Sequence, residues 1–325
     1  MSAGSTGLAG EAAQLPGATR NAGALRAAVH LRQVGAGAAR RSSPSRRAHR
    51  GPGFWLYLGC GSALAVAWVL PLLWEVVRSL EPPVLATAAP QGADFTHITL
   101  SNYRGLLGPS QDVGLNLANS VITAVGTAVL TVLVCTFAGY GLGRFRFRGS
   151  GLVFSVVLLA LMVPFQALLT PLFLELHFLH LTNNLLGLVV IYSTFNLPFG
   201  VFVMRNTFMQ IPRELLDSAN IDGAGPVGTL VRVLRPLVVP GMATTAIYAF
   251  LYSWNEFLQA LTFLTSDNLL TLPVKLFNIE IAAYGSVNFG YLSAGVVIAM
   301  VPCVALYFGL QRFYVRGLIS GAVKA

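Results

Sequence analysis

Six apolar stretches, each about 20 residues long or longer, place the strongest restriction on how this 325-residue chain can fold. A stretch of this length can cross the hydrocarbon core of a bilayer as a single α-helix. Only 10% of the residues are charged, whereas a soluble domain usually carries about 25%. The sequence therefore predicts an all-α integral membrane protein with six transmembrane helices, near residues 54–77, 115–142, 152–174, 185–204, 237–264 and 291–313.

The basic charge of the chain is concentrated before the first apolar stretch. Residues 1–53 contain eight arginines and one acid, Glu11, and account for +7 of the net charge of +9. We interpret residues 1–53 as a disordered cytoplasmic Arg-rich tail and residues 54–325 as the transmembrane domain. A secretory signal is not expected, since the first 30 or so residues lack an apolar core, but an organellar transit peptide stays open as an alternative.

Lysine and arginine side chains are distributed unequally between the two sides of the predicted membrane. With the tail placed inside, 18 basic residues lie on the inner side and three, Arg78, Arg104 and Lys275, lie on the outer side. Cytoplasmic loops typically carry such an excess of basic residues. We therefore expect both termini to be cytoplasmic, and the basic charge needs no nucleic-acid partner to explain it.

The inner loop at residues 210–236 is too long for a simple turn. Pro212 suits the first position of a helix, and the acids after it suit the first turn, where free N–H groups and the positive end of the helix dipole lie. Gly223 and Pro226 interrupt this pattern, and a second short helix is expected to end at Arg235. We predict two short helices joined by a turn of small residues, which another protein can approach closely. An amphipathic loop lying on the membrane is the alternative.

Ten residues of this loop match a known signature, namely Pro212, Arg213, Glu214, Leu215, Ala219, Ile221, Asp222, Gly223, Ala224 and Pro236. On these residues the loop resembles the cytoplasmic signature loop of ABC importer permeases of the carbohydrate (maltose-type) branch. It departs from the usual pattern at Asp217 and Ser218, where Glu and Ala are usual, and at Arg235, where an aliphatic residue is usual. Shorter segments at 144–149, 253–257 and 311–324 resemble the same branch.

The resemblance covers roughly residues 54–325 and implies the type I permease fold of ABC importers. It implies a transport subunit without catalytic residues, in a bacterial-type cell membrane. The implied partners are a second permease subunit, two cytoplasmic ATPase subunits, an extracytoplasmic solute-binding protein and a sugar. The residues implied to dock an ATPase subunit are Glu214, Asp217, Ser218, Ala219, Asp222, Gly223, Ala224 and Pro236.

The chain lacks the residues for binding a nucleotide or a metal. Both lysines, Lys275 and Lys324, follow a valine, whereas a P-loop needs Gly-Lys-Ser/Thr, so ATP hydrolysis is expected from another chain. Glycines at 139, 141 and 143 are better explained by close helix packing than by a nucleotide loop. We expect no cofactor and no metal, because the three cysteines lie far apart and His177 and His180 have no further ligand nearby.

Four polar or aromatic residues within or near the spans are candidates for a translocation path: Gln166, Trp254, Asn255 and Glu256. Ionisable residues in membrane segments usually face a protein interior or a water path. Hydrogen bonding between helices is the alternative role for each of them. Pro164, Pro171 and Pro302 are expected to kink their spans.

Other functions stay open at this point. The same class of importer could carry a polyol, a glycerol phosphate ester or another small solute, because the residues do not reveal the cargo. An ion-coupled transporter that works alone is a second alternative, separable by uptake without ATP. A membrane-embedded enzyme is disfavoured, since the sequence shows no paired carboxylates, histidine-rich metal set or serine–lysine pair.

Overall fold

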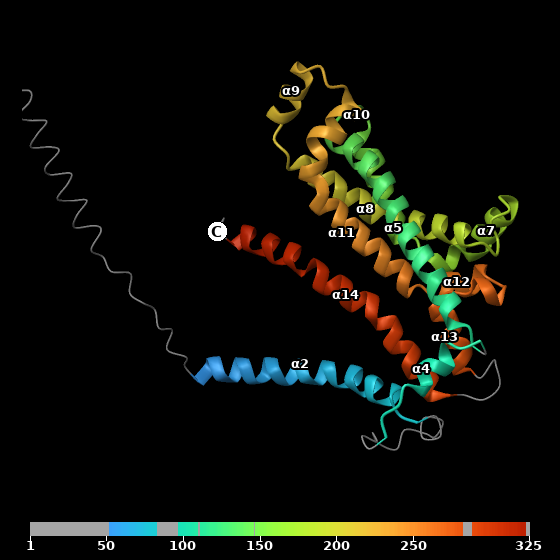
Figure 1. Cartoon of the computed structure of the whole chain (residues 1–325). Coiled ribbons are helices and arrows are strands. Elements are labelled where there is room, and N and C mark those ends of the chain that lie inside the picture. Colours follow the sequence, from blue (N-terminus) through green and yellow to red (C-terminus); the bar gives the residue numbers. More distant parts are fainter. Residues whose placement is uncertain (1–51, 83–96, 110, 146, 282–287, 323–325) are drawn as a thin grey trace, which may run out of the picture. The chain divides into compact units, whose positions relative to one another are not determined.

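A computed structural model describes residues 52–82, 97–109, 111–145, 147–281 and 288–322 of the chain (Figure 1). Residues 1–51 of the predicted tail lie outside these ranges, so the disorder of the tail stays a prediction. Contacts within the chain divide it into two units with a boundary between Val66 and Ala67, which falls inside helix α2 (Pro52–Ser79). The arrangement described below is that of the second unit.

Five helices of the described residues are long and apolar enough to cross a membrane. They correspond to α2, α5 (Val113–Arg144), α8 (Leu185–Met209), α11 (Arg235–Asn255) with the helical turns before it, and α14 (Phe289–Ala322). Apolar helices therefore lie at five of the six positions predicted for spans. All elements that the structure assigns within the described residues are helical, in agreement with the predicted all-α class.

The third predicted span is a bent pair of helices. Helix α6 (Ser150–Leu159) continues into the short 3₁₀-helix η1 (Ala160–Met162), and α7 (Phe165–Phe178) follows at an angle of 103°. Val163 has an extended backbone because the ring of the following proline disfavours the helical conformation. The kink expected at Pro164 is therefore confirmed, whereas a continuous helix over 152–174 is not. Counted as one bent span, the pair brings the total to six.

The fifth predicted span ends earlier than expected. Helix α11 stops at Asn255, and the short helix α12 (Leu258–Phe263) begins only after Glu256 and Phe257. Glu256 is extended, with φ −71° and ψ 122°, so it interrupts the predicted continuous helix over 237–264. The 3₁₀-helix η3 (Asp267–Leu269) and helix α13 (Leu272–Glu280) complete this part of the chain.

Helices α5, α8 and α11 pack along one another and form the centre of the second unit (Figure 1). Small residues allow the close approach. A Cβ atom at Gly139 of α5 would lie 2.8 Å from the backbone nitrogen of Arg205, and one at Gly143 would lie 3.1 Å from the carbonyl oxygen of the same residue. This confirms the predicted packing role for these two glycines, a common use of glycine between membrane helices. A cluster of buried apolar side chains closes the same end of the three helices and includes Met204, Phe208, Leu230, Leu234 and Val238.

A short helix, α4 (Ser101–Leu106), precedes α5 and is fixed to the end of α2. Asn102 is fully buried and donates hydrogen bonds to the carbonyl oxygens of Ser79 and Glu81, at 3.0 and 2.7 Å. Arg78 and Glu81 form a buried ion pair. These polar contacts hold α4 in place, where it packs against α14.

Candidate functional site

The predicted docking loop begins with helix α9 (Glu214–Ile221). The helix starts two residues after Pro212, and the carbonyl oxygen of Arg213 accepts hydrogen bonds from the backbone N–H groups of Leu216 and Asp217 at 2.9 and 3.0 Å. Acidic residues occupy its first turn, as expected from the helix dipole. The first of the two predicted loop helices is therefore present.

The second predicted short helix is wrong as a separate element. Helix α10 (Pro226–Gly228) and the π-helix η2 (Thr229–Leu234) run into α11, so one helix is continuous from Pro226 to Asn255. Pro236 has no N–H group, and its ring crowds the carbonyl group four residues earlier. The helical turns before Pro236 form a π-helix, and the helix continues through this position into α11. The loop is thus connected directly to the helix core.

Gly223 forms the turn between α9 and α10. Its φ of +73° lies in the left-handed region, which a Cβ atom makes unfavourable. The N–H group of Ala224 bonds back to the carbonyl oxygen of Ala219 at 2.9 Å, the contact that defines a glycine-terminated helix end. The space around a Cβ at Gly223 is empty, so backbone conformation alone calls for glycine there.

Most of the predicted docking residues are exposed. These are Glu214, Asp217, Ser218, Asp222, Gly223 and Pro236, whereas Ala224 is half-buried. Ala219 is only 5% exposed, so its small side chain faces this chain and not a partner. Leu215 is 40% exposed, whereas Leu216 is half-buried against the cluster of apolar side chains.

Exposed apolar side chains around the turn were not recognised from the sequence as part of this surface. Ile221 is 86% exposed and Val227 is 65% exposed, on either side of Gly223. Apolar side chains flanked by polar ones are typical of a protein-binding surface. The sequence does place an isoleucine at the very end of α9, but its exposure follows only from how α9 packs in the structure.

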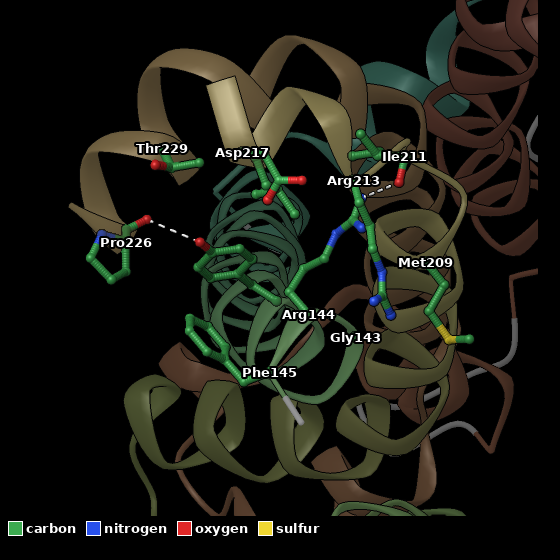
Figure 2. A pocket seen from close by; sticks show the side chains of 11 residues that line it. Gly143, Arg144, Phe145, Met209, Ile211, Arg213, Asp217, Pro226 and Thr229 are labelled. Carbon is green, nitrogen blue, oxygen red and sulfur yellow. Dashed lines mark hydrogen bonds between the residues drawn. The ribbon is translucent and has the colours of Figure 1, made fainter. Parts of the chain in front are cut away.

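Two side chains of α5 hold the loop. The Tyr140 hydroxyl donates to the carbonyl oxygen of Pro226 at 3.2 Å, and Nη2 of Arg144 donates to the carbonyl oxygen of Ile211 at 2.6 Å (Figure 2). The Tyr140 ring also packs on Phe208, with ring centroids 5.4 Å apart. These two hydrogen bonds therefore attach the segments before and after α9 to the C-terminal end of α5. A tyrosine and an arginine spaced by four residues at a helix end are the sequence signal for this anchor.

The four predicted path residues have separate surroundings. Trp254 is buried, donates from Nε1 to the carbonyl oxygen of Ala299 at 3.0 Å and thereby joins α11 to α14. Asn255 is exposed and bonds within its own helix, and Gln166 is exposed on α7. Glu256 is half-buried, and its Oε1 accepts a hydrogen bond from the N–H group of Gln259 at 2.7 Å, which caps α12. Trp254 therefore has a packing role.

A set of buried polar groups on α8 was missed from the sequence. The Tyr192 hydroxyl, Ser193 Oγ and Asn196 Oδ1 have no hydrogen-bond partner among the described residues. Nearby, Nε2 of buried Gln259 donates to the Tyr252 hydroxyl at 2.6 Å, and the Tyr192 and Tyr252 rings meet edge to face. Buried polar groups are usually paired, so these atoms need a partner, such as water, that the described residues do not supply. Their signal in the sequence is a Tyr-Ser-x-x-Asn pattern in an otherwise apolar span.

Comparison with known proteins defines the family. Residues 135–320 match the family described as "Binding-protein-dependent transport system inner membrane component". The match covers more than half of the chain and includes the loop and most of its anchoring residues. The chain belongs to this family and is a multi-pass membrane transport subunit.

Individual relatives agree with this assignment. The osmoprotective compounds uptake permease protein GgtD of Synechocystis sp. is 31% identical over 299 residues, which cover 89% of this chain and 99% of that protein. The arabinooligosaccharides transport system permease protein AraQ of Halalkalibacterium halodurans is 33% identical over 272 residues, or 83% of this chain and 96% of that protein.

A solved structure shares the fold. It is the crystal structure of a bacterial ABC transporter involved in the import of the acidic polysaccharide alginate, and its matched chain is 21% identical. The TM-score is 0.70, and the match covers 82% of this chain and 98% of that chain. The predicted permease fold of ABC importers is thereby confirmed.

Proposed function

We propose that this chain is a permease subunit of an ATP-driven sugar importer, forms half of its translocation path and docks an ATPase subunit through residues 210–236. The family assignment and the arabinooligosaccharide permease relative support this function. The observation that carries it is the exposed turn at Gly223, flanked by apolar and acidic side chains and attached to the helix core.

The continuous helix from Pro226 to Asn255 gives the loop a mechanical link to the core. A displacement of the docked turn would act on α10 and η2 directly, without a flexible joint in between. The same helix carries Tyr252 next to the buried polar groups of α8. ATP-driven movement at the loop would therefore alter the packing around those groups, as alternating access requires.

The remaining partners follow from the same function. A second permease subunit would supply the other half of the path, two cytoplasmic ATPase subunits would supply the energy, and an extracytoplasmic solute-binding protein would deliver the sugar. Both termini are assigned to the cytoplasm on the basis of the 18 basic residues of the inner side. The tail at 1–53 belongs to that side in this topology.

We assign the path within this chain to the buried polar groups, and place Tyr192, Asn196, Tyr252, Glu256 and Gln259 along it. Hydroxyl and amide groups next to aromatic rings are the chemistry that binds sugars, because each hydroxyl of the ligand needs a hydrogen-bond partner. Gln166 and Asn255 are exposed and stay candidates, whereas Trp254 does not.

Docking is tested by co-purifying the ATPase subunit with the chain after joint expression. Asp222→Arg and Gly223→Trp should each lower the amount of bound ATPase at least about tenfold, as expected for central residues of an interface. Leu161→Ala, at an exposed position in η1, is the matched control and should retain binding. Unchanged binding in both loop variants would disprove docking through this turn.

Transport is tested separately, in proteoliposomes that hold the assembled importer. Uptake of labelled sugar should require both ATP and the sugar-loaded binding protein. Uptake that persists without ATP would favour an ion-coupled transporter and contradict the proposal.

A second cargo, a small solute other than a sugar, is suggested by the relative whose name refers to the uptake of osmoprotective compounds; a polyol or a glycerol phosphate ester stays an alternative within this class. It keeps the same importer class and the same docking loop. A ligand screen on the binding protein separates the two cargoes, because only the cognate solute should bind tightly and stimulate ATP hydrolysis.

A further inference from the structure

A cavity of about 360 Å³ lies beneath the docking loop, between α9 and the ends of α5 and α8. Figure 2 shows the residues that line it, which are Tyr140, Gly143, Arg144, Phe145, Met209, Ile211, Arg213, Leu216, Asp217, Pro226 and Thr229. The volume corresponds to several water molecules, each of which occupies about 30 Å³ in the liquid. The cavity is thus large enough for a polar group bigger than water.

The side chains that line the cavity carry more positive than negative charge. Arg144 and Arg213 bring two positive charges, and Asp217 is the one acid among the lining residues. Arg144 uses one nitrogen to bind the carbonyl oxygen of Ile211, but its buried Nε atom has no hydrogen-bond partner among the described residues. Within the described part of the chain, Arg213 forms no ion pair. The exposed Arg213 guanidinium therefore has donors available to a ligand, and Arg144 adds a second positive charge to the same wall of the cavity.

We propose that this cavity binds a phosphate group, carried by a membrane phospholipid or by a soluble phosphate. The planar guanidinium group matches two oxygens of a phosphate at once, and two such groups at one site compensate its charge. Thr229 also lines the cavity, and its hydroxyl donates to the carbonyl oxygen of Ala224 at 3.4 Å. Docking of an ATPase requires none of these contacts, so the proposal goes beyond the transport function.

The position of the cavity favours a lipid as one source of the phosphate. It lies at the ends of two membrane-spanning helices, where lipid headgroups are found, and basic pockets between such helices bind anionic headgroups. Phe145 is 47% exposed and Met209 is 53% exposed, so apolar surface borders the arginines. An acyl or glycerol moiety next to the phosphate would contact these side chains.

The test measures lipid and phosphate binding by the purified full-length chain with native mass spectrometry in detergent. Phosphatidylglycerol should bind, and diacylglycerol, which has the same chains but no phosphate, should not. Arg213→Gln should weaken binding about fivefold, the effect of one basic residue near a membrane surface, and Asp217→Asn should strengthen it. Arg148→Gln removes an exposed arginine that does not line the cavity and should leave binding unchanged.

A second arm identifies the source of the phosphate. Inorganic phosphate that displaces phosphatidylglycerol at millimolar concentration supports a soluble ligand, whereas lipid binding resistant to phosphate supports a headgroup. Equal losses in Arg213→Gln and Arg148→Gln would reduce the effect to general surface charge and overturn the proposal. It is also overturned if neither phosphate source binds and Arg213→Gln impairs only ATPase association, because the arginine then serves a partner protein. The binding assay contains no ATPase, so its failure leaves the transport function untouched.

Discussion

The two ends of α5 differ in the number of hydrogen bonds that connect them to other segments of this protein. At the N-terminal end, Asn116 and Asn119 donate four hydrogen bonds to backbone carbonyl groups of residues 267–270, at 2.9 to 3.4 Å. Ser120 accepts a fifth bond, from the N–H group of Leu272, at 2.7 Å. All three side chains are buried, at most 4% exposed.

The C-terminal end of α5 holds the docking loop with fewer contacts. Tyr140 and Arg144 each make one hydrogen bond to a loop carbonyl group, and a cavity lies between them and α9. The bonds at the N-terminal end are redundant and shielded from water, so opening that end would break several buried bonds together. The loop end can shift at a smaller cost. We infer that the docking loop can move relative to α5, whereas residues 267–272 keep their position against the N-terminal end of α5.

The largest effect is expected at the N-terminal end. The double substitution Asn116→Ala and Asn119→Ala removes four bonds and leaves the buried carbonyl oxygen of Leu270 unpaired, which should cost about 3 kcal/mol of unfolding free energy. Thermal unfolding of the purified chain in detergent measures the change. A loss as small as that of the loop substitutions below would remove the distinction between the two ends.

An intermediate effect is expected at the turn of the docking loop. Gly223→Ala forces a Cβ atom into the left-handed backbone region and should cost about 1–2 kcal/mol. The cost should be local, as faster amide hydrogen exchange in α9 with little change in the unfolding temperature. Gly223→Asn is the matched control, because asparagine tolerates this backbone conformation better. Equal exchange in both variants would show that the turn is not limited by backbone conformation.

The smallest effect is expected for Tyr140→Phe. This change removes the hydrogen bond to Pro226 but keeps the ring that packs on Phe208. The freed carbonyl group belongs to an exposed residue and can bind water, so the loss should be below about 1 kcal/mol. Hydrogen exchange at α10 is the measurement. A loss of protection larger than that in Gly223→Ala would show that the docking loop is held as firmly to α5 as residues 267–272 are.

The membrane class and most of the spans were predictable because they depend on local composition. Each of α5, α8 and α14 is long and apolar enough to form in a bilayer, whatever its neighbours are. The errors occurred where a single residue changes the backbone. The kink at Pro164 was expected, but the helix over 152–174 is not continuous through it, and Glu256 ends α11 within an apolar stretch.

The docking loop was only partly predictable, for a related reason. Proline, glycine and acidic residues predicted α9 and its end from local rules. The exposure of Leu215 and the burial of Ala219 depend on which face of α9 meets the core, and two helical turns are too few for the apolar spacing to decide this. For Trp254, the sequence left open a contact with a solute or a hydrogen bond between helices, and the structure shows the hydrogen bond, to Ala299 of α14.

The sequence by itself determined that this chain is a membrane protein and which loop resembles the signature of its family. These properties depend on residue type and spacing along the chain. The tertiary structure decided which polar groups near Tyr192 have no hydrogen-bond partner among the described residues, and that Arg144 and Arg213 share one cavity with Asp217. Such groupings arise because α5, α8 and α11 pack against one another, and residues distant in sequence meet only when those helices are in contact.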